Sequence, residues 1–399
     1  MRDVYAVGVG ITSFTRLEYP LSEIAAYPAM MALKDAGLSK VDHLYVANMA
    51  SGRLNHQTGL ASAVVDSLSL TPAGAEVIEN GPASGASAIK TGWMAVASGL
   101  HDVVLVTGAE RLREVNNLEA TDAVATLSHP LAEYVYGVTL PALAAMFTRL
   151  YMQKYGVTDR HLGMVAVKNH GNAMRNFYAH LHEPITLQGI LDSPEAMTNN
   201  PFVAEPLRFF DCCPVSDGGA SVILASKDVA KDVSKKTGRP MVRLAGVGQA
   251  TDTHCVHERA EPTDLLAVRG AAKKAFDMAG VKPSQVSVAE LHDAFTILEI
   301  VESEEVGFFK KGEGHLALEK GETSMTGRIP INPSGGLKAK GHPVGATGMG
   351  QAHEIILQLR GEAKDQMGDR TVKGAKVGFT CNFGGFGNNV VCLVFVRED

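Results

Sequence analysis

Residues 335–348 read Gly-Gly-Leu-Lys-Ala-Lys-Gly-His-Pro-Val-Gly-Ala-Thr-Gly. This stretch combines a glycine-rich turn with the start of a helical segment, and it places His342 at the mouth of the turn. The N-terminus of a helix presents free N–H groups and a positive dipole, which favour an anion or a developing oxyanion. His342 could act there as a proton acceptor or an oxyanion donor, or it could be a loop histidine that caps the helix. The density of glycine, which lets a ligand approach the backbone, favours the first interpretation.

The composition is that of an ordinary globular protein. Of the 399 residues, 45% are hydrophobic and 20% are charged, and the formal net charge is −6. The length is sufficient for a large buried core. The negative charge argues against a sequence-independent nucleic-acid binder, and no uninterrupted apolar stretch is long enough to span a membrane. Asp3 lies in a segment that enters a strand at once, so we expect no signal peptide.

The five cysteines show neither a zinc motif nor a disulfide framework. No two of them form a C-x-x-C pair, and their number is odd. We therefore expect no metal site, and reduced thiols in a cytoplasmic protein. The cysteines are Cys212, Cys213, Cys255, Cys381 and Cys392.

Short β-branched runs alternate with helical stretches, which is typical of layered α/β folds. In the first half we expect helices at 22–36, with Ser22 as a possible N-cap, and at 85–97. The strands expected there are 4–9, 44–48, 76–78, 103–107 and 220–225.

A second series follows the Thr-Gly-Arg-Pro break at 237–240. Its expected helices are 264–279, 298–308 and 348–360. Its expected strands are 242–247, 286–291, 328–331, 376–380 and 390–396.

The two series resemble each other. The sequence Ala-Leu-Lys-Asp-Ala-Gly-Leu at 32–38 is similar to Ala-Phe-Asp-Met-Ala-Gly-Val at 275–281, and each precedes a strand. We interpret this as a tandem duplication with halves at 1–238 and 239–399, although generic βα patterning can produce a similar likeness. The Gly8-Val-Gly10 pair lacks the third glycine of a dinucleotide fingerprint, so nucleotide binding is rejected.

Residues 113–210 interrupt the alternation. The segment is rich in Met, His, Tyr and Asn and has no clear strand series. A stretch of this length usually forms a subdomain that covers a site, and an ordinary helical insertion is the alternative.

Three segments of the second half place polar or thiol side chains where a strand meets a loop. They are Glu290-Leu-His-Asp-Ala-Phe295, the Gly341-His-Pro343 turn, and Thr380-Cys-Asn-Phe-Gly-Gly385. Open α/β sheets bind ligands outside the ends of their strands, so these segments could converge. Taken alone, His292 is more often a structural histidine, and Cys381 a core residue.

With these motifs together, the chain resembles the thiolase superfamily over essentially its whole length. It is most similar to the sterol-carrier-protein-type and archaeal branch, in which His-Asp-x-Phe replaces Asn-Glu-Ala-Phe. The resemblance implies a duplicated α/β fold in a five-layered αβαβα body, with a loop subdomain over the site. It also implies a homodimer that uses coenzyme A as a substrate, with no permanently bound cofactor. Members of this branch often pair with a small zinc-ribbon and OB-fold protein.

The resemblance assigns roles to individual residues. His342 would deprotonate a thiol and help polarise a thioester oxygen, and His292 would help complete an oxyanion hole for an enolate. The backbone N–H of Gly384 would belong to a second oxyanion hole. Along the pantetheine arm of coenzyme A would lie Ser334, Gly335 and Gly336.

The chain departs from the family at two cysteines. The nucleophilic cysteine of a Cys-Ala-Ser-Gly motif is replaced by Pro82, which has neither a nucleophile nor an N–H to donate. Ser84 would be a weak acyl acceptor without a dedicated base. Asn382 occupies the position of the second, acid/base cysteine, and Cys381 lies one residue earlier. Because a one-residue step reverses the face of a strand, Cys381 can serve only if the strand end bulges or twists.

Two chemistries need no enzyme nucleophile. In the first, His342, alone or with Cys381, activates coenzyme A for direct thiolysis of a β-ketoacyl-CoA. The second is retro-aldol cleavage of a β-hydroxyacyl-CoA. It is supported by a resemblance to thiolase-like aldolases in the segment Ala204-Glu-Pro-Leu-Arg208 and in the following Asp-Cys-Cys at 211–213. The intact histidines favour thiolysis, and they count against a third possibility, a non-catalytic subunit of a complex.

Overall fold

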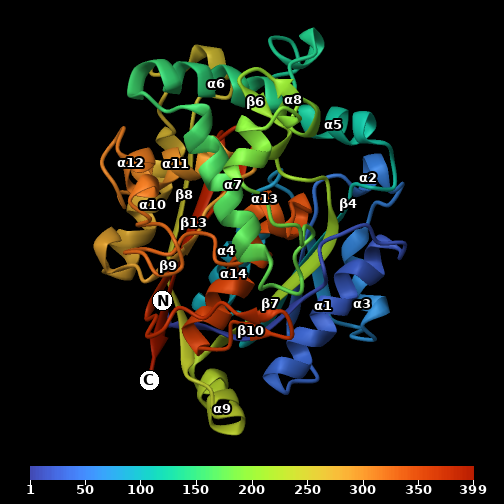
Figure 1. The fold of residues 1–399 in the computed structure, drawn as a ribbon. Helices are drawn as coiled ribbons and strands as arrows, with labels where there is room; N and C mark the ends of the chain where they lie inside the picture. Colours follow the sequence, from blue (N-terminus) through green and yellow to red (C-terminus); the bar gives the residue numbers. More distant parts are fainter.

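The computed structural model describes residues 1–399 and contains a nine-stranded mixed sheet (Figure 1). The strand order is β3-β2-β4-β7-β1-β8-β13-β12-β9. The nine strands are β1 (Val4–Ile11), β2 (His43–Ala47), β3 (Gly74–Ile78), β4 (Val103–Arg111), β7 (Asp217–Ser226), β8 (Met241–Thr251), β9 (Val288–Glu290), β12 (Val377–Gly384) and β13 (Asn389–Glu398). Two small hairpins lie outside it, β5 (Phe202–Ala204) with β6 (Leu207–Arg208), and β10 (Lys364–Asp365) with β11 (Gly368–Asp369).

The sheet consists of two halves, and the order of the four strands in the second half matches that of four strands in the first, which has β3 as an additional edge strand. Counted from the junction, the first half runs β1-β7-β4-β2-β3 and the second runs β8-β13-β12-β9. The two first strands, β1 and β8, pair antiparallel at the junction. In each half the first and last strands of the series are therefore neighbours, and the duplicated α/β fold predicted from the sequence is confirmed.

Matching glycine pairs bring one helix close to each half. A Cβ on Gly8 or Gly10 of β1 would lie 2.3 or 2.1 Å from a carbonyl oxygen of α1 (Leu21–Ala36). A Cβ on Gly246 or Gly248 of β8 would lie 2.0 Å from a carbonyl oxygen of α10 (Leu266–Ala279). Only glycine permits so close an approach, so the Gly8-Val-Gly10 pair serves helix packing.

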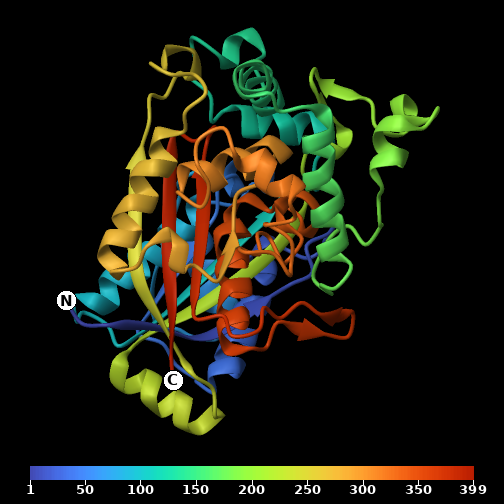
Figure 2. The same cartoon turned by 60° about the vertical axis from the view of Figure 1, so that its left-hand side comes forward.

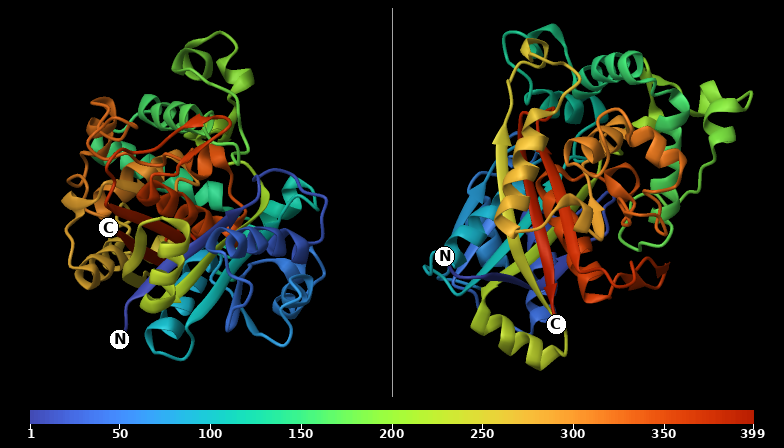
Figure 3. Two further views of the ribbon diagram at one scale, coloured as in Figure 1. Left: turned by 90° about the horizontal axis from the view of Figure 1, so that it is seen from below. Right: turned by 90° about the vertical axis from the view of Figure 1, so that its left-hand side faces the viewer.

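Helices form the other layers of the molecule (Figures 2 and 3). On the outer faces, α1 and α3 (Leu60–Ser67) pack against the first half, and α10 packs against β8 and β13. Between the halves, α4 (Ser84–Ala97) and α14 (Val344–Arg360) pack against each other and against strands of both halves. The halves of the sheet pair only through Tyr5 with Arg243 and Ala6 with Val242, and α4 and α14 lie between them, so each half forms its own layer. The result is the five layers αβαβα, with the N-termini of α4 and α14 at the same end of the sheet.

The insertion forms a helical layer at that end (Figure 1). Its main helices are α5 (Asn117–Ala125), α6 (Leu140–Tyr155) and α7 (Asp159–Ala173). None of the helices in the molecule has both the length and the apolar character needed to cross a bilayer. The remaining short or peripheral helices are α2 (Ser51–Leu54), α8 (Ala196–Asn199), α9 (Lys227–Thr237), α11 (Thr296–Glu305), α12 (Gly314–Glu319) and α13 (Gly336–Lys340).

Two local predictions are wrong. Helix α1 begins at Leu21 after Pro20, and no side chain caps it, so Ser22 is not an N-cap. Residues 328–331 do not form a strand, and Ile331 makes only one isolated parallel bridge, to Ala289. Pro330 lacks the N–H that a continuous ladder requires.

Candidate active site

A cavity of about 190 Å³ lies where the insertion meets the ends of β9 and β12. It brings His292 and His342 together with Pro82, as the sequence motifs suggested. The other lining residues are Leu112, Ala120, Thr121, Val124, Leu127, Leu140, Pro141, Cys212, Cys213, Pro214, Val215, Ala294, Phe295, Leu298, Val344, Phe383, Gly385 and Phe386.

A tight turn between α13 and α14 presents His342 to the cavity. Gly341, the residue before it, has a φ of 113°, and a Cβ there would lie 2.7 Å from Ser216 Oγ. Any other residue would be strained and would collide with the serine. The Ser216 hydroxyl in turn accepts a hydrogen bond from the His342 backbone N–H at 3.3 Å.

The hydrogen bonds of His342 assign its tautomer. Its Nδ1 lies 2.7 Å from Thr347 Oγ1, and the Thr347 hydroxyl donates its proton to the Pro343 carbonyl oxygen at 3.0 Å. A hydroxyl has one proton to donate, so in the Thr347–His342 contact the imidazole must be the donor. Nδ1 of His342 therefore carries the proton, and Nε2 keeps its lone pair for use as a base.

His292 has the opposite tautomer. Its Nδ1 lies 3.2 Å from the amide nitrogen of Asn382 and 3.4 Å from the backbone N–H of Phe383. Both partners are donors, so Nδ1 accepts and Nε2 carries the proton. The ring stacks on that of Phe383, with centroids 5.1 Å apart, and it meets the His342 ring at 86° with centroids 5.0 Å apart.

Burial keeps both imidazoles neutral. It lowers the pKa of His342 to about 3, and it lowers the pKa of His292 well below its usual value, with a further contribution from His342. A neutral pair with opposite tautomers supplies one hydrogen-bond acceptor and one donor to the same cavity.

This neutrality predicts the pH dependence of the reaction. We expect protonation of His342 to cause no loss of kcat/KM from pH 7.5 to 5.5, because His342 remains an unprotonated base until far below its usual pKa. An imidazole with the ordinary pKa of about 6.5 would lose about tenfold over this range. A pH–rate profile checks this, and a tenfold acid limb with its midpoint near pH 6.5 would contradict it.

Pro82 lies at the start of α4 and contributes no reactive group to the cavity. Ser84, two residues later, does not line the cavity. Its hydroxyl donates to the carbonyl oxygen of Gly81 at 2.5 Å and accepts from the N–H of Asn80 at 2.8 Å. Ser84 thus closes the turn before the helix and is not placed as an acyl acceptor.

The structure does not bring Cys381 to the cavity. Asn382 contacts His292, whereas Cys381 is fully buried and faces the opposite side of β12, against Cys392 and Glu302. Burial raises the pKa of its thiol, so it stays protonated. β12 remains regular through this position, and the one-residue step from Asn382 therefore reverses the face. Gly384 ends β12 and does not itself line the cavity, whereas its neighbours Phe383 and Gly385 do.

Ser334, Gly335 and Gly336 lie behind the site and not on the cavity wall. The Ser334 hydroxyl donates to the buried carboxylate of Glu290 at 2.7 Å. Gly336 has a φ of 60°, and a Cβ there would lie 2.2 Å from a carboxylate oxygen of Asp293. These residues therefore pack the loop before His342 against β9 and against the segment after it that contains His292.

Both halves of the chain match known families. Residues 6–228 match the thiolase N-terminal domain, and residues 248–397 match the thiolase C-terminal domain-like family. The chain belongs to the thiolase family. It is 41% identical to the acetyl-CoA acetyltransferase of Methanothermobacter thermautotrophicus, a match that covers 100% of both chains. It is also 31% identical to sterol carrier protein 2 of Homo sapiens, over 98% of this chain and 72% of that protein. It is therefore a thiolase-like acyltransferase of the sterol-carrier-protein-type branch.

Solved structures agree with this assignment. The Ltp2-ChsH2(DUF35) aldolase superposes with a TM-score of 0.81 at 26% identity, over 99% of this thiolase and 98% of that chain. The acetyl-CoA acetyltransferase from Syntrophomonas wolfei superposes with a TM-score of 0.73 over 100% of both chains. At 18% identity, the second similarity concerns the fold alone.

Three further residues of this thiolase support the two imidazoles. Thr347 fixes the tautomer of His342, Asn382 orients His292, and the fully buried Glu110 joins the two halves. The carboxylate of Glu110 accepts the N–H of Gly345 in the first turn of α14 at 3.1 Å. It also accepts three N–H groups of the first half, from Asn48 Nδ2, Met49 and Ala50, each at 3.0 Å. The residue type alone does not predict the roles of Asn382 and Glu110, because their hydrogen-bond partners are far away in the sequence.

Glu110→Gln should destabilise the protein and slow the reaction. Each carboxylate oxygen accepts two N–H donors, whereas the amide of glutamine presents only one oxygen and turns its NH₂ group toward two other donors. We expect a loss of about 2–3 kcal/mol in urea unfolding, together with a lower kcat because the turn of His342 shifts. The control is Glu114→Gln, which removes a partly exposed ion pair with Arg111 and should cost less than about 1 kcal/mol. Equal stability of the two variants would contradict this role.

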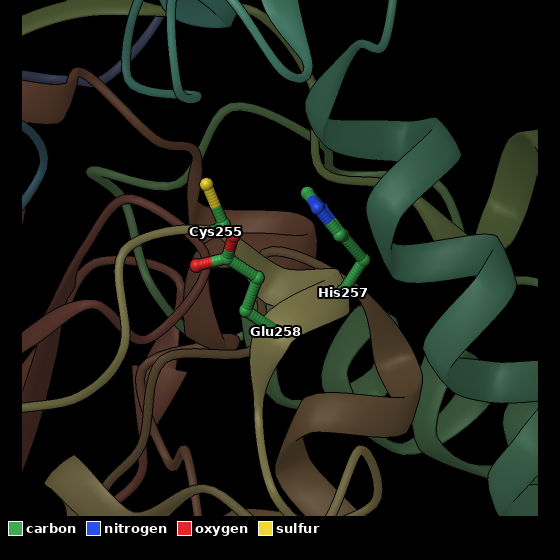
Figure 4. A group of neighbouring side chains, drawn as sticks. All are labelled: Cys255, His257 and Glu258. Carbon is green, nitrogen blue, oxygen red and sulfur yellow. The ribbon is translucent and has the colours of Figure 1, made fainter.

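One group of side chains in this thiolase could offer ligand atoms to a metal ion. Cys255, His257 and Glu258 belong to one short turn, and their ligand atoms all lie within 4.8 Å of one another (Figure 4). His257 and Glu258 are exposed, and none of the three lines the cavity. The group is therefore separate from the two imidazoles.

Proposed function

We propose that this protein cleaves a β-ketoacyl-CoA by thiolysis, with the thiol of coenzyme A as the nucleophile and no acyl-enzyme. One observation carries the proposal: His342 with a free Nε2 lone pair and His292 with an Nε2–H line the same cavity, beside Pro82. Attack by an external thiol requires a base and an oxyanion donor, and it requires no enzyme thiolate.

The proposed steps balance without another reactant. His342 Nε2 takes the proton of the coenzyme A thiol, and the thiolate attacks the β-carbonyl carbon. The tetrahedral intermediate, stabilised by the N–H of Gly384, collapses with cleavage of the bond between the α and β carbons. A new acyl-CoA leaves, and the enolate of the shortened thioester is stabilised by the Nε2–H of His292. His342 then returns its proton to the α carbon.

Retro-aldol cleavage of a β-hydroxyacyl-CoA is the second candidate. The fold similarity to the Ltp2-ChsH2(DUF35) aldolase supports it, as does the lack of a reactive group at Pro82. In this reaction His342 would take the proton of the β-hydroxyl group, and His292 would stabilise the same type of enolate. No second coenzyme A molecule would be needed.

We also propose an assembly of two copies of this chain with a small zinc-ribbon and OB-fold partner. The aldolase neighbour is a complex with a DUF35 protein, which supports the partner. The edge strand β3 supports the homodimer, because it has no neighbour on one side and leaves Val77 42% exposed. Size-exclusion chromatography with light scattering tests the dimer, and co-purification from the native source tests the partner.

The kinetic order of the reaction tests the proposed function. When the β-ketoacyl-CoA and coenzyme A concentrations are both varied, direct attack predicts intersecting double-reciprocal lines, and an acyl-enzyme predicts parallel lines. Cys212 and Cys213 are the thiols on the cavity wall, so the double variant Cys212→Ser, Cys213→Ser is the matched control and should remain active. Loss of activity in that variant would overturn the proposal.

Product analysis separates the alternatives. Cleavage of a β-hydroxyacyl-CoA without added coenzyme A would favour the retro-aldol reaction. Failure to turn over either substrate, alone and with the partner, would favour a non-catalytic subunit.

A further inference from the structure

Apart from the two imidazoles, the wall of the cavity is largely apolar. Its side chains come mainly from the insertion and from α11, and they include Leu112, Val124, Leu127, Leu140, Leu298 and Phe386. No Asp, Glu, Lys or Arg lines the cavity. Apart from the imidazoles, its polar side chains are the hydroxyl of Thr121 and the thiols of Cys212 and Cys213.

The two thiols carry no charge. Burial raises the pKa of Cys213 to about 12 and raises that of Cys212 further, so both are protonated at neutral pH. The buried ammonium group of Lys338 interacts with these thiols and with the carboxylates of Asp293 and Asp211. Lys338 does not line the cavity. A carboxylate at the far end of a substrate would therefore meet no cation there, and burial of an unpaired charge is costly.

The volume determines the size of the group that the cavity can enclose. An engineered protein cavity of about 150 Å³ lined by aliphatic and aromatic side chains binds benzene. The cavity of about 190 Å³, which includes the space in front of the two imidazoles, therefore encloses a group the size of benzene with one or two further atoms, counted from the thioester carbon. A fused sterol ring system is much larger.

We infer that this cavity selects a neutral, apolar acyl group of about six to eight carbons, aliphatic or aromatic, and rejects dicarboxylic and sterol-derived acyl groups. This inference rests on the proposed function, because it takes the thioester of the substrate to lie at His342 and His292. The insertion then determines which acyl group is bound, and His342 and His292, near the ends of the strands, carry out the reaction.

Binding of unreactive ligands tests the inference without any turnover. Saturated acyl-CoA thioesters lack the β-oxygen and cannot be cleaved, so their dissociation constants can be measured by calorimetry on the full chain, with its partner if one co-purifies. We expect affinity to rise about threefold to fourfold per methylene up to six to eight carbons and then to stop rising. An eight-carbon acyl-CoA with a terminal carboxylate should bind at least about 30-fold more weakly than its apolar counterpart.

Variants of Leu127 connect the selectivity to this wall. Leu127 lines the cavity and is only half-buried, so its replacement should leave the core intact. Leu127→Ala should move the optimum to longer chains, and Leu127→Lys should improve binding of the carboxylated ligand at least tenfold while it weakens binding of the apolar one. The control is Leu118→Ala on α5, because Leu118 is 82% exposed and does not line the cavity.

The outcomes separate this inference from the proposed function. Equal affinity for the carboxylated and apolar ligands, affinity that rises steadily to sixteen carbons, or no binding of any acyl-CoA would overturn the inference. If the expected selectivity appears but neither β-keto nor β-hydroxy thioesters react, the inference stands and the proposed function fails.

Discussion

His342→Ala should lower kcat by about 10³-fold, with much less effect on the binding of acyl-CoA. The substitution removes the only side chain on the cavity wall that the hydrogen bonds assign as a base, since the tautomer of His292 makes that imidazole a donor. Steady-state kinetics with a β-ketoacyl-CoA measure the loss, and a thermal melt verifies that the variant is folded.

Thr347→Val is the informative control for His342→Ala. Valine keeps the shape of threonine but removes the oxygen that accepts the Nδ1 proton of His342. The imidazole then loses its tautomer preference, and we expect an intermediate loss of about tenfold. If Thr347→Val were as damaging as His342→Ala, the role of His342 would lie in packing. If His342→Ala retained most of the activity, His342 would not be the base.

The sequence motifs predict most of the fold, because each motif combines several independent structural requirements that few other folds would meet together. The sequence Gly341-His342-Pro343 needs a glycine with positive φ beside Ser216, a histidine that faces the cavity and the start of a helix, and all three are present. Residues 328–331 were misassigned because their β-branched pattern contains Pro330, which has no ladder N–H.

The site was less predictable, because its contacts join distant segments. Gly336 looks like a ligand-binding glycine in the sequence, yet it is needed to make room for the carboxylate of Asp293, more than forty residues earlier. Cys381 is the reverse case: its residue type suggests chemistry, but its position on β12 turns the thiol away from His292. A glycine can make room for a neighbouring side chain or for a ligand, and a thiol can be a core group or a catalytic group. Which role applies depends on the residue that faces it in the fold, and the sequence does not show that residue.

Pro82→Cys should form an acyl-enzyme, which the mechanism proposed for the native protein does not use. A cysteine at this position would lie on the cavity wall with both imidazoles, just before the N-terminus of α4. The helix N-terminus lowers the pKa of a nearby thiol, and the neutral Nε2 of His342 can accept its proton. After incubation with an acyl-CoA, intact-protein mass spectrometry should show one acyl group on most molecules of the variant and none on the native protein.

Two controls make the Pro82→Cys result specific. Pro82→Ala removes the proline without adding a thiol, so it should remain unacylated even though Cys212 and Cys213 line the same cavity. Hydroxylamine should release the acyl group from Pro82→Cys, as expected for a thioester. Acylation of the native protein at Cys212 or Cys213 would show that the chain already contains its own nucleophile, and the external thiol would then be unnecessary. A folded Pro82→Cys variant that never becomes acylated would show that the carbonyl carbon of the substrate does not lie beside Pro82, and the placement of the thioester between His342 and His292 would fail with it.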